Sequence, residues 1–129
     1  GESFDGGMYS TPLIGRGDCD SLIIVPMSIH KPIFKGDLVA MNRYTGKIVY
    51  QVPLEHYAWS SPVGFYNENG KLYVVQGDCA GNMYIFEGAT GKRLFWQKIG
   101  DNFESSPAVV DNALVVGSRG KVIFKMLVE

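Results

Sequence analysis

Two short motifs recur along this chain at a fixed spacing, and this repeat limits the fold more than any other feature. Ser-Ser-Pro at residues 60–62 returns at residues 105–107, and Thr-Gly-Lys at residues 45–47 returns at residues 90–92, so both motifs repeat after 45 residues. Ser-Thr-Pro at residues 10–12 is an earlier copy of the first motif, 50 residues before Ser61, which predicts an insertion in the first repeat. A repeat of this length is typical of folds that stack copies of one supersecondary unit.

Each repeat contains the pattern of four short strands. Between residues 58 and 100 the segments that favour β-structure are 58–63, 72–75, 83–86 and 93–99, separated by turn sequences at 67–71, 77–82 and 90–92. Four such segments with three turns are typical of an antiparallel meander. A four-stranded meander with this period predicts one blade of a β-propeller.

The flanking sequence fits the same register. Before the central repeat we expect strands at 9–14, 22–25, 37–42 and 48–52, and after it at 107–110, 114–117 and 122–127. Pro26 should end the second of these strands, because proline donates no backbone hydrogen bond, and residues 27–35 should form a long loop. The predicted fold is all-β, with antiparallel four-stranded meanders as consecutive blades of an incomplete propeller. It forms one domain with blades at 9–54, 55–101 and 102–129, about eleven strands, and no helix longer than a turn or two.

Continuous apolar runs mark the middle strands. Residues 22–25, 72–75 and 114–116 are apolar throughout and do not alternate with polar residues. A strand has this composition when both of its faces are covered, as they are between two neighbouring blades.

Composition excludes several classes of function. The chain has 129 residues, of which 46% are hydrophobic and 19% charged, as in a folded domain. With a net charge of −1 it offers no basic surface for nucleic acid, and it shows no transmembrane segment and no N-terminal export signal. In the repeat register Cys19 falls between the first and second strands and Cys79 between the second and third, which places them on opposite faces. We therefore expect no disulfide bond between them, and their spacing suggests no metal site.

The segments around the two Thr-Gly-Lys copies resemble the repeat of quinoprotein dehydrogenases, which bind pyrroloquinoline quinone (PQQ). In that family an alanine, an acidic residue, a Thr-Gly pair and a tryptophan form a docking motif, in which the aromatic ring stacks between adjacent blades. The corresponding positions here are Ala40, Asn42, Gly46 and Tyr50, and then Glu87, Gly91, Phe95 and Trp96. Tyr50 and Phe95 stand where the family has tryptophan, and Trp96 follows one position later.

The resemblance implies a fold more than an activity, since one propeller fold serves unrelated tasks. The family's enzymes hold PQQ with calcium over the central channel, often above two adjacent cysteines. This chain has no Cys-Cys pair and no evident acidic cluster for calcium, so we assign it no catalytic, cofactor-binding or metal-binding residue. We expect a non-catalytic binding or scaffold module that is a fragment of a quinoprotein-like propeller. The alternatives are part of a PQQ-dependent dehydrogenase, or a sensor or assembly domain that binds extended peptide chains. The family also implies a bacterial periplasmic or cell-surface location.

Aromatic residues beside the Ser-Pro motifs are the candidates for a partner surface. Such side chains commonly pack between blades. In a complete propeller, however, these aromatic residues would form a row along the rim of the central channel. Together with the 27–35 loop, the candidate residues are Tyr9, His30, Tyr57, Trp59 and Phe103. We expect a protein or peptide partner, and self-association or completion by further blades at the open ends of the arc.

Two other motifs have simpler explanations. Residues 88–92 resemble a phosphate-binding loop, but the spacing is short and a strand follows, so a hairpin turn is expected. Arg-Gly-Asp at residues 16–18 matches an adhesion tripeptide, yet glycine and aspartate are common in any turn. His30 and His56 have no partner at ligand spacing and are expected on surface loops.

Overall fold

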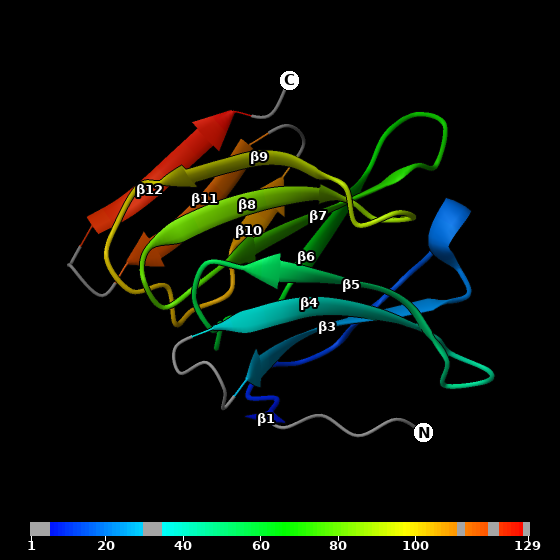
Figure 1. Ribbon diagram of the computed structural model, residues 1–129. Helices are drawn as coiled ribbons and strands as arrows, with labels where there is room; N and C mark the ends of the chain where they lie inside the picture. The colour runs from blue at the N-terminus through cyan, green and yellow to red at the C-terminus, as the bar shows by residue number, and fades with distance from the viewer. Residues whose placement is uncertain (1–5, 30–34, 111–112, 119–121, 128–129) are drawn as a thin grey trace.

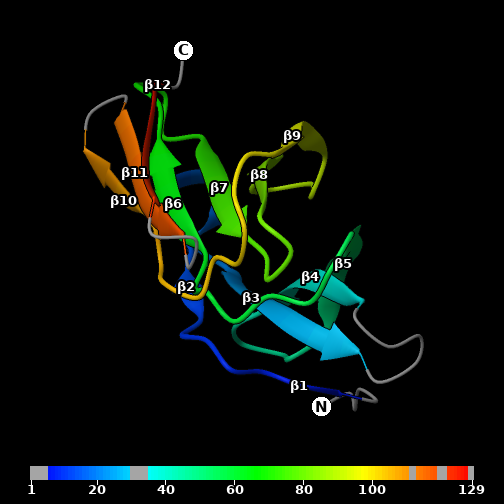
Figure 2. The ribbon, with the colours of Figure 1, turned by 90° about the vertical axis from the view of Figure 1, so that its left-hand side faces the viewer.

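A computed structural model describes residues 6–29, 35–110, 113–118 and 122–127. In this part of the chain three antiparallel sheets follow one another in sequence order, with the second between the other two (Figures 1 and 2). The only helical segment among the described residues is a 3-10 turn, η1 (Gly17–Cys19). The predicted all-β fold of consecutive meanders is therefore confirmed.

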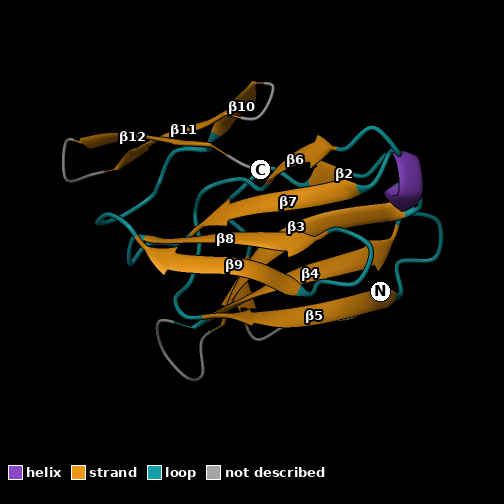
Figure 3. Cartoon of the chain, turned by 90° about the horizontal axis from the view of Figure 1, so that it is seen from above, coloured by secondary structure: helices purple, strands orange, loops and turns teal. Residues whose placement is uncertain are grey.

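The first sheet has the order β1-β3-β4-β5. β2 also pairs with β3, at Ile23 and Ile24, whereas β1 pairs with it at Ser28 and Ile29. Its strands are β1 (Gly6–Gly7), β2 (Leu13–Ile14), β3 (Leu22–Ile29), β4 (Gly36–Asn42) and β5 (Ile48–Leu54). The turn η1 lies on the side of the molecule away from β12 (Figure 3).

The second and third sheets are simple meanders. The second has the order β6 (Val63–Tyr66), β7 (Leu72–Gly77), β8 (Asn82–Glu87) and β9 (Arg93–Lys98). The third has the order β10 (Ala108–Val110), β11 (Ala113–Ser118) and β12 (Val122–Leu127). The order in space follows the order in sequence, as the repeat predicts.

The prediction that Pro26 ends its strand is wrong. β3 continues to Ile29, and Pro26 pairs with Leu38 of β4. On the other side of β3, the partners of β2 end at Ile24 and those of β1 begin at Ser28. Pro26 lies in the gap between them, where a strand has no neighbour to which a backbone N–H could donate, so the proline breaks no hydrogen bond.

The innermost strand of the first sheet is also shorter than predicted. Residues 9–14 were expected to form one strand, but only Leu13 and Ile14 pair with β3 there. Pro12 has no N–H, and the N–H of Thr11 donates instead to Ser61 Oγ beside the second sheet, at 2.9 Å. This part of the chain is therefore held by the neighbouring repeat and not by its own sheet.

The core consists of two apolar layers on either side of the second sheet. Val74 belongs to the layer shared with the first sheet, whereas the next residue, Val75, belongs to the layer shared with the third sheet. Both are fully buried, and full burial of such a side chain contributes about 1.5–3 kcal/mol. Alternate residues of β7 thus face different sheets, which explains the continuous apolar run at 72–75.

Among the described residues, no helix is long and apolar enough to cross a bilayer.

Candidate functional site

The two Thr-Gly-Lys copies form hairpin turns of the same geometry. Gly46 N–H donates to Asn42 O and Gly91 N–H donates to Glu87 O, both at 2.8 Å. The two glycines have φ angles of 72° and 76°, which L-residues with a side chain rarely adopt. The first turn is also held by Asn42 Oδ1, which accepts from Tyr44 N–H at 2.9 Å, and the second by Glu87 Oε1, which accepts from Thr90 Oγ1 at 3.1 Å. Residues 90–92 are therefore a hairpin turn and not a phosphate loop.

Tyr50 crosses from the first sheet to the second turn. A Cβ atom placed on Gly91 would lie 2.6 Å from Tyr50 Cδ1, so only glycine allows the ring to approach this closely. The Tyr50 hydroxyl donates to Gly88 O at 2.8 Å. Burial raises the pKa of Tyr50 well above its usual value, which keeps this hydroxyl a donor. Ala40, the cross-strand partner of Tyr50, is fully buried beneath it.

Phe95 holds the position of Tyr50 one repeat later. Ala40 pairs with Tyr50 and Ile85 pairs with Phe95, and in both hairpins the register shifts at the next residue. Phe95 is half-buried and lies on the same face of the second sheet as its partner Ile85. Ile85 packs toward the third sheet. The docking positions of the sequence thus recur in the same local geometry.

Trp96 lies on the other side of the same strand. It pairs with Tyr84, is 47% exposed, and donates from Nε1 to Asn82 Oδ1 at 3.1 Å. The Arg93 guanidinium lies 5.1 Å from the ring centroid, a cation–π arrangement. Trp96 therefore lies at the sheet surface, where it covers polar residues, and it is not enclosed between two sheets.

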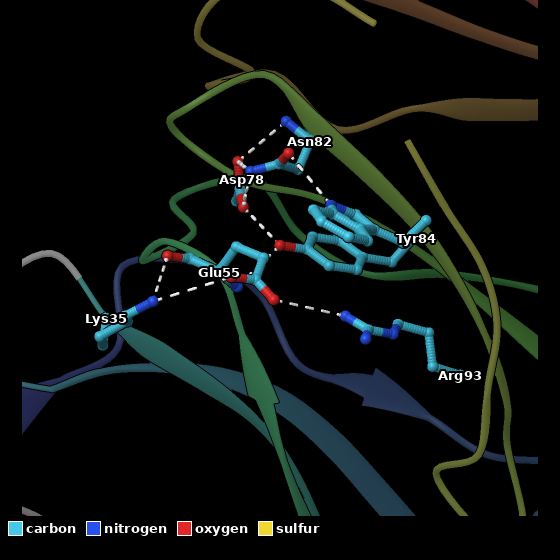
Figure 4. A network of polar contacts seen from close by, with 7 residues as sticks. Lys35, Glu55, Asp78, Asn82, Tyr84 and Arg93 are labelled. Atoms are coloured by element: carbon cyan, nitrogen blue, oxygen red, sulfur yellow. Dashed lines mark hydrogen bonds and ion pairs between the residues drawn. The ribbon is translucent and has the colours of Figure 1, made fainter. Parts of the chain in front are cut away.

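That polar site is centred on the buried carboxylate of Asp78, which the sequence analysis did not single out (Figure 4). Asp78 accepts hydrogen bonds from the backbone of Ala80 and Asn82, from the Asn82 amide, and from the Tyr84 hydroxyl at 2.7 Å. A buried carboxylate is stable only when such donors surround it. The Gly-Asp turn followed by Asn82 and Tyr84 on β8 was the available signal.

Tyr84 connects this site to the first sheet. Its hydroxyl also accepts from Glu55 N–H at 2.8 Å. Burial, and then the hydrogen bond to Asp78, raise the pKa of Tyr84 well above its usual value. The Glu55 carboxylate lies 3.8 Å from Lys35 Nζ and 3.6 Å from Arg93, and all three side chains are exposed (Figure 4). Exposed ion pairs contribute little to stability, so the buried Tyr84 bonds are the main link.

Three of the predicted partner residues come together on the surface. The ring of Trp59 lies 5.7 Å from Tyr9 and 5.5 Å from Tyr57 between centroids, and His56 lies 4.2 Å from Tyr57. Tyr9 is 70% exposed and Trp59 is also exposed. We call Tyr9, His56, Tyr57 and Trp59 the aromatic cluster. It joins the chain before β2 to the connection between β5 and β6.

Two other predicted partner residues do not belong to this surface. Phe103 is fully buried, because it packs with Val75 and Leu114 and its Cβ would lie 3.0 Å from a Cβ on Gly77. Its assignment to a partner surface is therefore wrong. His30 lies outside the described residues.

Other sequence motifs have structural partners. Asp18 of the Arg-Gly-Asp turn accepts from Leu72 N–H at 2.9 Å through Oδ1, and its own N–H donates to Gly70 O. This carboxylate joins two repeats.

Cys19 and Cys79 are free thiols, and burial raises their pKa values to about 12 and about 11, so neither is a thiolate nucleophile near neutral pH. Among the described residues no group of three or more ligating side chains could hold a metal ion.

The sequence matches no protein-family model and no curated protein. Solved structures share its fold. One is a europium-containing methanol dehydrogenase, with a TM-score of 0.61 and 18% identity over 92% of this chain and 24% of that chain. Another is a quinohemoprotein alcohol dehydrogenase from Pseudomonas putida HK5, with a TM-score of 0.60 and 18% identity over 92% of this chain and 18% of that chain. The chain spans a quarter or less of these structures and has the fold of a partial quinoprotein-type β-propeller.

Proposed function

We propose that this chain is a segment of a larger quinoprotein-like β-propeller and serves as a non-catalytic binding or scaffold module. Its blades would be residues 9–54, 55–101 and 102–129, and the positions of Tyr50 and Phe95 would dock successive blades. The observation that carries the proposal is the aromatic cluster, where Tyr9 from one repeat and Trp59 from the next form one exposed surface. A periplasmic or cell-surface location follows from the resemblance alone.

The aromatic cluster has the composition of a contact surface. Tyrosine and tryptophan bury a large apolar area with few rotatable bonds, and they are enriched among residues that dominate binding energy. The ring planes of Tyr9 and Tyr57 are tilted by 52° and 32° to that of Trp59. The surface therefore offers both ring edges and ring faces for contact. An extended peptide with apolar side chains at alternate positions fits such a surface.

The experiment is a fluorescence titration with extended peptides rich in aromatic and aliphatic residues. In the Trp96→Phe background Trp59 is the sole tryptophan, and a bound peptide should shift its emission. Tyr9→Ser should weaken binding about tenfold or more if this ring is among those that dominate the contact. Tyr44→Ser is the matched control, because Tyr44 is an exposed tyrosine in the turn at the other end of β5. Equal binding by both variants would contradict the proposal.

The second candidate is part of a quinone-dependent dehydrogenase, which the fold shared with two such enzymes favours. It predicts that the protein binds pyrroloquinoline quinone with calcium and oxidises alcohols. Absorbance of the bound quinone and turnover with methanol or a sugar would support this candidate against the binding module.

A further inference from the structure

One position beside the aromatic cluster recurs in every repeat, namely the residue directly before the Ser-Ser-Pro or Ser-Thr-Pro motif. It is Tyr9 in the first repeat, Trp59 in the second and Glu104 in the third. We call these three residues the entry row. Two of its members belong to the aromatic cluster, and the third carries a carboxylate.

Hydrogen bonds hold the three repeats in the same register at this row. Thr11 N–H donates to Ser61 Oγ at 2.9 Å, and Ser61 N–H donates to Ser106 Oγ at 3.1 Å. Each of these three residues lies two positions after the entry-row residue of its own repeat. The members of the row therefore follow one another in space in the order of the repeats.

The turn after β7 holds the second and third members of the row. Cys79 N–H donates to Tyr57 O at 3.0 Å, and Phe103 N–H donates to Asp78 O at 3.1 Å. Two adjacent residues of one turn thus bind the chain just before each of these two row positions. The backbone that carries the indole ring and the backbone that carries the carboxylate are held by the same turn.

The Cys79 thiol interacts with both of these row positions. Burial is the largest cause that raises its pKa, a hydrogen bond from the Trp59 backbone lowers it, and the negative charges of Asp78 and Glu104 raise it again. Asp78 is buried among its donors, whereas Glu104 is exposed. Glu104 Oε1 accepts from the Asn102 amide at 2.9 Å, and a carboxylate can accept further hydrogen bonds. The surface beside the aromatic cluster therefore carries a negative charge.

An exposed indole ring beside a carboxylate suits a guanidinium group. A guanidinium is planar and always charged, so it can stack on an aromatic face and donate to a carboxylate at the same time. The protein already contains such an arrangement on another tryptophan. Arg93 lies 5.1 Å from the ring centroid of Trp96, and its Nη1 lies 3.6 Å from the Glu55 carboxylate.

We propose that the entry row binds an extended peptide whose arginine stacks on Trp59 and donates to Glu104, with an apolar side chain two residues away on Tyr9. This inference rests on the proposed function and adds the chemical class of the peptide. Side chains two residues apart on one face of an extended chain are separated by about 6.6 Å. The ring centroids of Tyr9 and Trp59 are 5.7 Å apart, so one strand can place a side chain on each.

Fluorescence anisotropy with a labelled peptide tests this inference. The peptide is capped at both ends and has a central phenylalanine, an arginine two residues away on each side, and serine elsewhere. Its control carries citrulline in place of both arginines, which keeps the shape of the side chain and removes the charge. The arginine peptide should bind about three- to thirtyfold more tightly, through one ion pair and one cation–π contact.

A matched pair of variants locates the charge that is responsible. Glu104→Gln should reduce the advantage of the arginine peptide about two- to fivefold, because it removes the ion pair and keeps the shape. Glu68→Gln is the control and should leave that advantage unchanged. It makes the same change in charge at an exposed position of the turn beyond the other end of β6. Circular dichroism checks that both variants keep their β-structure.

Salt provides a second test that needs no variant. Raising the ionic strength from about 0.05 M to about 0.5 M should narrow the difference between the two peptides, because exposed charges are screened. The citrulline peptide should bind almost equally at both ionic strengths, since its contact is apolar.

Equal affinity of the wild-type protein for the two peptides would overturn this inference, and so would an arginine advantage that Glu104→Gln leaves unchanged. Both results would leave the proposed function standing, provided that the citrulline peptide binds and Tyr9→Ser weakens its binding. If neither peptide binds, the proposed function fails and this inference fails with it.

Discussion

The hydroxyl of Tyr50 donates a hydrogen bond to the carbonyl oxygen of Gly88, 2.8 Å away, and joins the outer strand of the first sheet to the hairpin turn of the second. The ring lies against Gly91, where no other residue would leave it room. An aromatic side chain, a glycine and a backbone carbonyl together link the two repeats.

Tyr50→Phe should cost about 1 kcal/mol in the free energy of unfolding, since it removes one hydrogen bond and keeps the ring. Tyr50→Ala should cost about 3 kcal/mol, because it also leaves a cavity beside Gly91. Urea denaturation of both variants measures the two values. Equal costs for Phe and Ala would show that the ring contributes nothing to the link.

Trp96→Ala should cost less than Tyr50→Ala, although both replace a large aromatic side chain. Trp96 is half-exposed and loses mainly its bond to Asn82, so a cost of about 1 kcal/mol is expected. The sequence alone predicts an equal loss for both, from burial between blades. Thermal unfolding of the two variants side by side distinguishes the two expectations.

Asp78→Asn should destabilise the fold by about 2–3 kcal/mol. The new amide group would place a donor against the donors of Asn82 and Tyr84, and a buried group without its partner costs the full desolvation penalty. Combining Asp78→Asn with Tyr84→Phe should cost less than the sum of the single changes, since both belong to one network. Additive losses would mean that the two side chains act separately.

Stability should fall as the pH rises above about 9. Burial raises the pKa of Cys79 from 9.0 to about 11 and that of Cys19 to about 12, so in this range the thiols ionise in the unfolded chain before they ionise in the folded one. Their contribution is complete below pH 9 and is lost as the pH approaches the folded values. Replacing both cysteines by alanine should flatten the loss between pH 9 and 11, as measured by denaturant midpoints. A slope unchanged by these replacements would assign the loss to other groups, such as Tyr84.

The sequence predicted the repeat, the order of the strands and the hairpin turns, because these depend on local signals. Thr90 and Gly91 determine a turn within a few residues, and the apolar run at 72–75 indicates a strand with both faces covered. The path of β3 through Pro26 could not be predicted, because it depends on where β1 and β2 end on the neighbouring edge.

The candidate site was predicted only in part, for a related reason. The sequence analysis grouped Tyr9, Tyr57 and Trp59 by their places beside the Ser-Pro motifs. The structure brings their rings together, and their role as a partner surface stays a prediction. Phe103 also precedes a Ser-Pro motif, but by two residues, whereas Tyr9 and Trp59 each precede theirs by one, and it is buried against Gly77. The Asp78 network depends on contacts with Glu55 and Trp96, which are distant in the sequence and carry no local signal.

The most direct test of the binding module uses the two indole signals of the protein in proton–nitrogen correlation spectra. Trp59 belongs to the aromatic cluster, whereas the Trp96 indole lies outside that cluster, is bonded to Asn82 and serves as an internal reference. On titration with an extended peptide, the Trp59 indole signal should move in a saturable way and the Trp96 signal should stay in place. Saturable movement of Trp96 alone, or of neither signal, would contradict the account.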